Sequence, residues 1–348
     1  MAILKKPNSA FKKSFLVLFV FLILTGNFQM YTSAFDYTRK SEEINIRDPY
    51  ILVYDGKYYM YGTGLSGVGY GCAVSEDLEY WSNSINIFTP AADFEGDGCY
   101  WAPECHYYNG CFYLFATFHS KNTGYRGVGI FKSNSPTGPF ELISDGHITP
   151  HDRDCIDGTL YVDESGTPWM VYVNEWTSND DGVGTMAAAR MSSDLTHFEG
   201  DGTELFRADG HIWTDSKVTD GPFMYKTKAG KLIMLWSNNC KSGGYAVGLC
   251  RSSNGNVNGK YIHSPFALYK KDKKTALDGG HAMLFTSLDG QLKMAIHSPN
   301  SSGDGLFERA VFIDMVDTGS VVKIKGSSSK IRDIFTEIYF SLMGLFVS

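Results

Sequence analysis

The sequence predicts an all-β protein, a five-bladed β-propeller with four antiparallel strands in each blade. Hairpin turns recur at five points along the chain, and their glycines are 54, 56, 64 and 60 residues apart. A dipeptide such as Asp-Gly between apolar runs favours a tight hairpin, because its backbone tolerates positive φ. One strand-rich unit repeated at a near-constant period indicates a repeat fold, and five copies indicate five blades. The turns lie at Asp55-Gly56, Asn109-Gly110, Ser165-Gly166, Ala229-Gly230 and Asp289-Gly290.

Each turn joins two runs of almost continuous apolar and aromatic residues, a pattern typical of strands buried on both faces. These hairpins are expected at residues 50–62, 104–116, 159–172, 222–236 and 282–296. A second pair of strands follows each hairpin, which completes the four strands of a propeller blade. The second pairs are expected near residues 71–81, 128–140, 186–198, 245–261 and 309–325.

The two ends of the chain differ from the repeats. Residues 1–34 combine four lysines, an apolar run from Phe15 to Leu24 and small residues at the end, the layout of a signal peptide. The alternative is an uncleaved membrane anchor, although the apolar run is short for a span. We expect the propeller over residues 35–325 and a secreted or extracytoplasmic protein. Residues 326–348 form a short linker and a tail of unknown role, in which 331–347 has the pattern of an amphipathic capping helix.

The charge of the chain restricts its partners. Removal of residues 1–34 takes away four lysines and no acidic residue, so the formal net charge changes from −7 to −11. An acidic surface repels nucleic acid and anionic lipid, so we expect neither nucleic acid nor, beyond the signal peptide, a membrane as partner. A neutral substrate is compatible with this charge.

The seven cysteines do not predict a zinc site, because no Cys-x-x-Cys pair is present. Their odd number leaves at least one thiol unpaired within the chain. Cys240 and Cys250 are the candidates for a disulfide across a loop, and most of the others are expected to be small buried apolar groups.

A polar group stands before each hairpin at nearly the same offset. In a propeller the innermost strand of every blade begins near the axis, so we expect Asp48, Asp157, Asp220 and His281 to meet at one mouth of the central channel. Crowded carboxylates raise one another's pKa, which suits chemistry that needs one acid protonated and another ionised. The alternative for any single Asp is ordinary turn chemistry. His281 alone is equally compatible with a core histidine, a metal ligand or a substrate contact.

Carboxylates at the pocket of a secreted, aromatic-rich protein suggest glycoside cleavage. Four tryptophans are candidate platforms for stacking a sugar, although for each a packing role is at least as plausible. Trp101 is the best candidate because it adjoins an axial entrance. The four are Trp101, Trp176, Trp213 and Trp236.

The entrances resemble glycoside hydrolase family 43, a family of five-bladed propellers that remove arabinose and xylose units from plant polysaccharides. The resemblance covers roughly residues 45–315, and five short motifs occur in the family's order. They are Arg47-Asp-Pro-Tyr-Ile51, Trp101-Ala-Pro-Glu104, Ile156-Asp-Gly-Thr-Leu160, Val218-Thr-Asp-Gly-Pro222 and Asp278-Gly-Gly-His281.

The resemblance implies roles for individual residues. Asp48 matches the general base, and Asp157 matches the acid that tunes and orients the proton donor. His281 matches a residue near the channel, where many members hold a calcium ion. Trp101 and Arg309 match positions that line the sugar pocket. No cofactor is required for the chemistry.

One match is imperfect, because the family has Glu before Gly-Pro as proton donor and this chain has Asp220. The shorter side chain reaches about 1.5 Å less far, and a misplacement of that order can reduce the rate greatly. Either the pocket has moved to suit Asp220, or another carboxyl donates, or activity is weak. Glu175 and Glu104 are the other carboxyls, and we expect both at the substrate.

We therefore expect an inverting, exo-acting glycosidase that removes arabinofuranosyl or xylosyl units from a plant polysaccharide or oligosaccharide. In an inverting enzyme the carboxyls of Asp48 and Asp220 lie roughly 6.5–9.5 Å apart, which leaves room for a water. The rival interpretation is a glycan-binding propeller that has lost efficient catalysis. A protein-interaction propeller has less support, because it leaves the axial acids unexplained. Specificity is expected in the loops 64–70, 122–126, 178–184 and 209–217.

Overall fold

The computed structural model describes residues 35–271, 277–300, 307–327 and 330–347. Within the last range the side chains of residues 330, 331, 345 and 347 are not described. The predicted signal peptide, residues 1–34, lies outside the described residues. The chain from Asp36 onward forms one compact unit.

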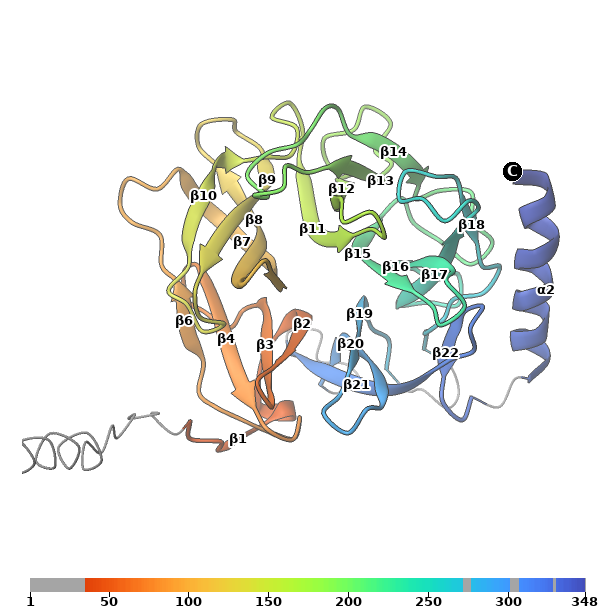
Figure 1. Cartoon of the computed structure of the whole chain (residues 1–348), viewed down its shortest axis with the longest axis horizontal. Coiled ribbons are helices and arrows are strands. Elements are labelled where there is room, and N and C mark those ends of the chain that lie inside the picture. Colours follow the sequence, from red (N-terminus) through yellow and green to blue (C-terminus); the bar gives the residue numbers. More distant parts are fainter. Residues whose placement is uncertain (1–34, 272–276, 301–306, 328–329, 348) are drawn as a thin grey trace, which may run out of the picture. The chain divides into compact units, whose positions relative to one another are not determined.

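Five antiparallel sheets are arranged in a ring around a central axis, the predicted five-bladed β-propeller (Figure 1). The first blade contains β2 (Arg47–Tyr54), β3 (Lys57–Thr63) and β4 (Tyr70–Ser75). Two short strands, β5 (Tyr80–Trp81) and β6 (Ile85–Phe88), pair with β4, and β1 (Arg39–Lys40) pairs with β5. A 3-10 turn, η1 (Ser41–Glu43), follows β1. The second contains β7 (Gly96–Tyr108), β8 (Cys111–Ser120), β9 (Arg126–Ser133) and β10 (Glu141–His147).

The other three blades each have four strands in sequence order from the axis outward. The third contains β11 (Cys155–Val162), β12 (Pro168–Asn174), β13 (Thr185–Arg190) and β14 (Thr203–Arg207). The fourth contains β15 (Asp220–Lys226), β16 (Leu232–Asn239), β17 (Tyr245–Ser252) and β18 (Tyr261–His263). The fifth contains β19 (Gly280–Thr286), β20 (Leu292–Pro299), β21 (Glu308–Asp317) and β22 (Val322–Ile324).

The predicted hairpins are confirmed in all five blades, and the structure changes one outer strand. The expected fourth strand of blade three near Phe198 is instead β14, while Phe198 forms a single bridge with Met191. The segment around Phe198 is rich in polar turn residues, and Ser192 and Asp194 accept hydrogen bonds from the backbone there. These local bonds compete with a regular ladder.

The ring closes between blade five and blade one through residues far apart in sequence. The first strands of successive blades are in contact, and β19 contacts β2. The Ile46 backbone N–H donates to the Glu308 carbonyl at 2.9 Å, and the Glu308 N–H donates to Asn45 Oδ1 at 3.1 Å. The Arg47 guanidinium pairs with the Glu308 carboxylate at 2.7 Å. Closure therefore brings the start of β2 against β20 and β21, beside the axis.

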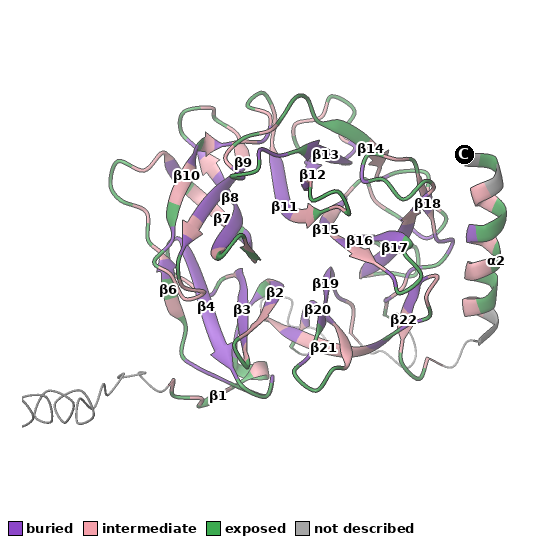
Figure 2. Ribbon diagram, in the orientation of Figure 1, coloured by how far each residue is buried: buried purple, intermediate pink, exposed green. Residues whose placement is uncertain are grey.

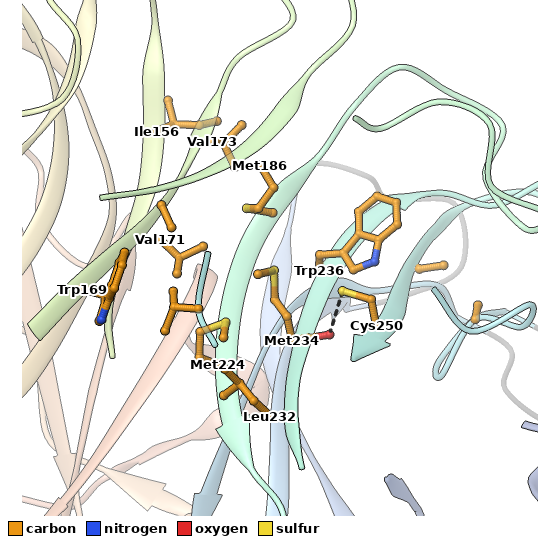
Figure 3. Packing of buried hydrophobic residues seen from close by; sticks show 14 of the residues in the cluster. Ile156, Trp169, Val171, Val173, Met186, Met224, Leu232, Met234, Trp236 and Cys250 are labelled. Carbon is orange, nitrogen blue, oxygen red and sulfur yellow. Dashed lines mark hydrogen bonds between the residues drawn. The ribbon is translucent and has the colours of Figure 1, made fainter. Parts of the chain in front are cut away.

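The inner strands of the blades are mostly buried (Figure 2). Apolar side chains pack between neighbouring blades. Between blades three and four, Val171, Val173 and Met186 meet Met234 and Trp236, all with almost no exposed surface (Figure 3). Because both faces of the inner strands are covered, these strands have no polar alternation, as the sequence pattern predicted.

The helix α2 (Lys330–Val347) occupies the predicted C-terminal segment and lies against the outer side of the propeller. Phe340 is fully buried in the cluster between blades four and five, and the Arg251 guanidinium lies over its ring at 4.6 Å. Leu342, two residues further along, is 54% exposed. Among the described residues, no helix has both the length and the hydropathy that crossing a membrane requires.

All seven cysteines carry free thiols. The disulfide considered between Cys240 and Cys250 is absent, since Cys250 Sγ lies against the Met234 carbonyl in the core. Cys72, Cys105 and Cys155 are buried, as expected for small apolar groups.

The docking of α2 gives a prediction for stability. Phe340→Ala should lower the free energy of unfolding by about 3 kcal/mol, because it empties a buried aromatic site. Leu342→Ala, on the exposed side of the same helix, should change it by less than about 0.5 kcal/mol. Denaturant unfolding of both variants measures the difference, and equal effects would show that the helix does not depend on this contact.

Candidate active site

The innermost strand of every blade begins with the same β-bulge. In all five blades the register shifts over the first residues, and the residue at the shift has positive φ, between 41° and 56°. Such backbone costs about 1–2 kcal/mol for a residue other than glycine, so it persists only when the surroundings enforce it. We call these five residues the bulge residues; they are Asp48, Ala102, Asp157, Gly221 and His281.

Each bulge residue is fixed by a hydrogen bond from its backbone N–H to a side chain of the preceding blade. In four cases the acceptor lies on the second strand of the preceding blade. There it pairs with the residue that comes directly before the bulge residue of that same blade. The bonds are Asp48 to His297 Nδ1 at 3.0 Å, Ala102 to Thr63 Oγ1 at 2.8 Å, Asp157 to Thr117 Oγ1 at 3.1 Å, Gly221 to Asp157 Oδ2 at 3.0 Å, and His281 to Ser237 Oγ at 2.8 Å.

Blade three departs from this pattern. The position opposite Ile156 is occupied by Val173, which has no polar atom. The Gly221 N–H bonds instead to the Asp157 carboxylate. Because Val173 offers no acceptor, the Asp157 carboxylate takes its place at the start of blade four.

Positive φ at the blade entrances points the side chains into one pocket of about 460 Å³, within the size range of small-ligand sites. The predicted residues Asp48, Asp157, Asp220 and His281 all line it, as does Trp101. The remaining lining residues are Arg47, Thr63, Ile156, Glu175, Trp176, Val218, Asn239, Tyr245, His297 and Glu308. The expected convergence of the acids is therefore confirmed.

From their similar offsets before the turns, the three aspartates are expected at equivalent positions of their strands, and this expectation is wrong. Asp48, Asp157 and His281 are bulge residues, whereas Asp220 precedes the bulge residue Gly221. The physical reason is space, because a Cβ on Gly221 would lie 2.7 Å from Cγ of His281. The bulge position of blade four accepts only glycine, and the carboxyl enters the pocket from the residue before it.

Asp48 is held ionised by its neighbours. Its Oδ1 lies 3.1 Å from His281 Nδ1, and its Oδ2 accepts a hydrogen bond from the Thr63 hydroxyl at 2.7 Å. Burial by itself would raise the pKa of Asp48, but the His281 imidazolium and its hydrogen bond outweigh burial and hold that pKa well below its usual value. Although burial opposes it, the charges of Asp48 and Asp157 raise the pKa of His281 to about 10.

Asp220 is the acid that retains its proton. Burial and the charge of Asp157 raise the pKa of Asp220 to about 8, against a hydrogen bond from Tyr245 that favours the anion. The Tyr245 hydroxyl donates to Oδ2 at 2.9 Å, while Oδ1 is buried without a hydrogen-bond partner. Burial also raises the pKa of Asp157, to about 6, so near neutral pH Asp157 is mostly charged and Asp220 mostly protonated.

An aromatic wall stands beside the acids. Trp101 is 36% exposed, and the Arg126 guanidinium lies 5.6 Å from the centre of its ring. Arg126 is fixed in turn by Glu175 at 2.6 Å and by Asp154 at 2.9 Å. Burial raises the pKa of Glu175 although Arg126 opposes the shift. This network places a cation over the Trp101 ring at the edge of the pocket.

Several predicted site residues lie away from the pocket. Glu104 is buried two residues beyond the bulge of blade two, where its carboxyl lies 3.1 Å from His106 Nε2. Arg309 follows Glu308 on β21, and since successive side chains on a strand alternate, Glu308 faces the pocket and Arg309 does not. Trp213 and Trp236 pack in the core between blades three and four. Trp176 does line the pocket.

Sequence reasoning missed Thr63, Tyr245, His297 and Glu308. All four lie on the second or third strand of a blade, where the search for polar groups before each hairpin does not reach. A signal for two of them exists, since Thr63 and His297 occur at equivalent ends of the second strands. Glu308 is brought in by ring closure, which no local pattern encodes.

Calcium binding at His281 stays a prediction. His281 Nδ1 faces the Asp48 carboxylate, and a protonated imidazole has no lone pair for a metal. Within the described ranges, His, Cys, Asp and Glu side chains form no group of three or more arranged to hold a metal ion. These residues do not form a protein cage for calcium.

A five-bladed propeller whose axial pocket holds one protonated and one ionised carboxyl has the architecture of a glycoside hydrolase. The comparison with family models agrees, because the model for glycosyl hydrolases family 43 matches residues 43–319. The chain belongs to this family.

Solved structures and curated proteins add further relatives. An endo-arabinase from Bacteroides thetaiotaomicron has 37% sequence identity and a TM-score of 0.72, over 81% of this chain and 98% of that one. An endo-1,4-beta-xylanase from the same organism has 28% identity and a TM-score of 0.70, over 82% and 95% of the two chains. An extracellular endo-alpha-(1->5)-L-arabinanase of Bacillus subtilis is 25% identical over 38% of this chain and 44% of its own length. The chain spans less than half the length of the curated relatives it matches.

The crowding at Gly221 gives a prediction for activity. Gly221→Ala should displace the His281 ring from Asp48 and lower kcat by about 100-fold, because small misplacements at a site have large rate effects. Gly56→Ala is the matched control, since Gly56 also has positive φ, 70°, but no atom lies within 4 Å of an added Cβ. Kinetics and melting temperatures of both variants test this, and an equal loss of kcat in both would contradict it.

Proposed function

We propose that this chain is a secreted, inverting glycosidase that cleaves arabinofuranosyl or xylosyl linkages in plant cell-wall polysaccharides. The observation that carries the proposal is the pair of oppositely protonated carboxyls, Asp48 and Asp220, in one pocket. The similarity to the endo-arabinase and to extracellular arabinan-active proteins supports arabinan as the first substrate to test and supports secretion.

In the proposed reaction Asp48 accepts a proton from water as the water attacks the anomeric carbon. Asp220 donates its proton to the departing glycosidic oxygen, so the leaving group departs as a neutral alcohol. Asp157 remains charged, held by the Gly221 N–H, and its charge keeps the proton on Asp220. Trp101, fixed by Arg126, offers a face against which a sugar ring stacks.

Asp220 is preferred to Glu175 as the proton donor. Glu175 accepts bonds from the Arg126 guanidinium, which stabilises its charged form and opposes donation. The partner of Asp220 is a neutral phenol, and its nearest carboxylate neighbour favours protonation. The shorter reach of Asp220 relative to Glu is accommodated if the sugar sits deeper in the pocket.

Replacement of the base gives the most direct prediction. Asp48→Asn should lower kcat on an aryl arabinofuranoside or on arabinan by about 1,000-fold, the scale of general acid–base catalysis. Asn tolerates positive φ, so the backbone at the bulge is retained. The matched control is Asp55→Asn at an exposed hairpin turn, which should leave kcat unchanged. Undiminished turnover by Asp48→Asn would contradict the base assignment.

The stereochemistry of the wild-type reaction is followed by NMR in the same assays. The first-formed sugar should have the anomeric configuration opposite to that of the substrate. A product of retained configuration would contradict the inverting mechanism. Binding of arabinan by calorimetry with no product from the wild type would favour a glycan-binding propeller.

The pH dependence should report the state of Asp220. Because catalysis needs its proton, kcat should fall as the pH rises through about 8, the pKa of Asp220. Asp157→Asn removes the charge that raises this pKa, so the fall should move to lower pH by about one unit. A basic limb that does not move in Asp157→Asn would contradict the coupling of the two acids.

A further inference from the structure

Thr63 differs from the other residues that fix the bulges, because its hydroxyl also donates a hydrogen bond to the carboxylate of the proposed base, Asp48. Its Oγ1 accepts the Ala102 N–H at 2.8 Å and lies 2.7 Å from Asp48 Oδ2. A hydroxyl has a single proton, and a backbone N–H can only donate. The proton of Thr63 therefore points to Asp48 Oδ2, which must accept it.

Among the described residues, the other contacts of Asp48 leave Thr63 as one of two donors to its carboxylate. His281 Nδ1 donates to Oδ1. His297 Nδ1 also lies near Oδ1, at 3.3 Å, but this nitrogen accepts the Asp48 backbone N–H at 3.0 Å. With its lone pair used in that way, His297 Nδ1 carries no proton for the carboxylate. The Thr63 hydroxyl is thus the partner that sets the direction of Oδ2.

The same hydroxyl reaches the aromatic wall. Ala102 directly follows Trp101, so a displacement of the Trp101 backbone is transmitted to Asp48 through one side chain. Thr117 occupies the equivalent position in blade two and holds the Asp157 N–H at 3.1 Å. Unlike Thr63, Thr117 makes no hydrogen bond to a carboxylate among those found in the described residues.

We propose that Thr63 is a positioning residue for the hydrolytic reaction, whose hydroxyl ties the sugar platform at Trp101 to the Asp48 carboxylate and keeps that carboxylate aligned. The proposal rests on the proposed function, because it assumes that Asp48 acts as the base.

The test compares Thr63→Val, Thr63→Ser and Thr117→Val in the full chain, with an aryl arabinofuranoside as substrate. Thr63→Val should lower kcat by about 10- to 100-fold, the cost of one hydrogen bond to a charged group. Thr63→Ser keeps the hydroxyl and should restore kcat to near wild type.

Thr117→Val is the matched control, because it removes the same hydroxyl and leaves a bulge N–H unpartnered without touching Asp48. It should lower kcat far less than Thr63→Val does, whatever its effect on the melting temperature. If Thr63→Val does not fold, Thr63→Ala is measured in its place against Thr117→Ala. An equal loss of kcat in the Thr63 and Thr117 variants, or a loss that Thr63→Ser fails to restore, would overturn the proposal.

Asp48→Asn separates this proposal from the proposed function. If Asp48→Asn is inactive while Thr63→Val keeps the wild-type kcat, only the role of Thr63 fails. If Asp48→Asn is fully active, the base assignment itself fails.

Discussion

The site depends on the hydrogen bond from each bulge N–H to a side chain of the preceding blade, which we call a latch. Five strands begin with a positive-φ bulge, and each bulge N–H is accepted by a side chain of the preceding blade. Left-handed backbone is unfavourable for Asp and His, so the latches and the bulges require each other. The bulge turns side chains from the strand into the channel mouth, and the circular arrangement brings them together. Ring closure positions the proposed base for the same reason, since the last latch joins His297 of blade five to Asp48 of blade one.

Three aspartates in one pocket would repel one another if all were ionised. The pocket avoids this repulsion because each aspartate has a different partner. The His281 imidazolium compensates Asp48, and the Gly221 N–H compensates Asp157. Asp220 has a phenol as its hydrogen-bond partner, and burial and the charge of Asp157 keep a proton on it. Val173 contributes indirectly, because its side chain has no polar atom and the Gly221 N–H donates to Asp157 instead. The proposed acid and base roles thus follow from which latch each blade provides.

The sequence was sufficient for the fold and for the convergence of the acids. Turn glycines at near-equal spacing and apolar strands give the hairpins, and the symmetry of a propeller then places Asp48, Asp157, Asp220 and His281 together. The offset of Asp220 was not predictable from spacing, because it depends on the room that His281 leaves at Gly221. Thr63 and Tyr245 escaped notice since their roles come from contacts between blades and not from a local motif. Arg309 is expected at the substrate from the resemblance and Glu104 as an alternative carboxyl, but strand alternation and register keep both out of the pocket lining.

The catalytic roles require that Asp220 holds its proton near neutral pH while Asp48 does not. Carbon-13 NMR of side-chain carboxyls, in protein labelled at aspartate and titrated from pH 4 to pH 10, measures this directly. We expect one aspartate resonance that titrates with a pKa near 8 and is missing from Asp220→Asn. A spectrum in which every aspartate carboxyl is ionised below pH 6 would contradict this division of charge.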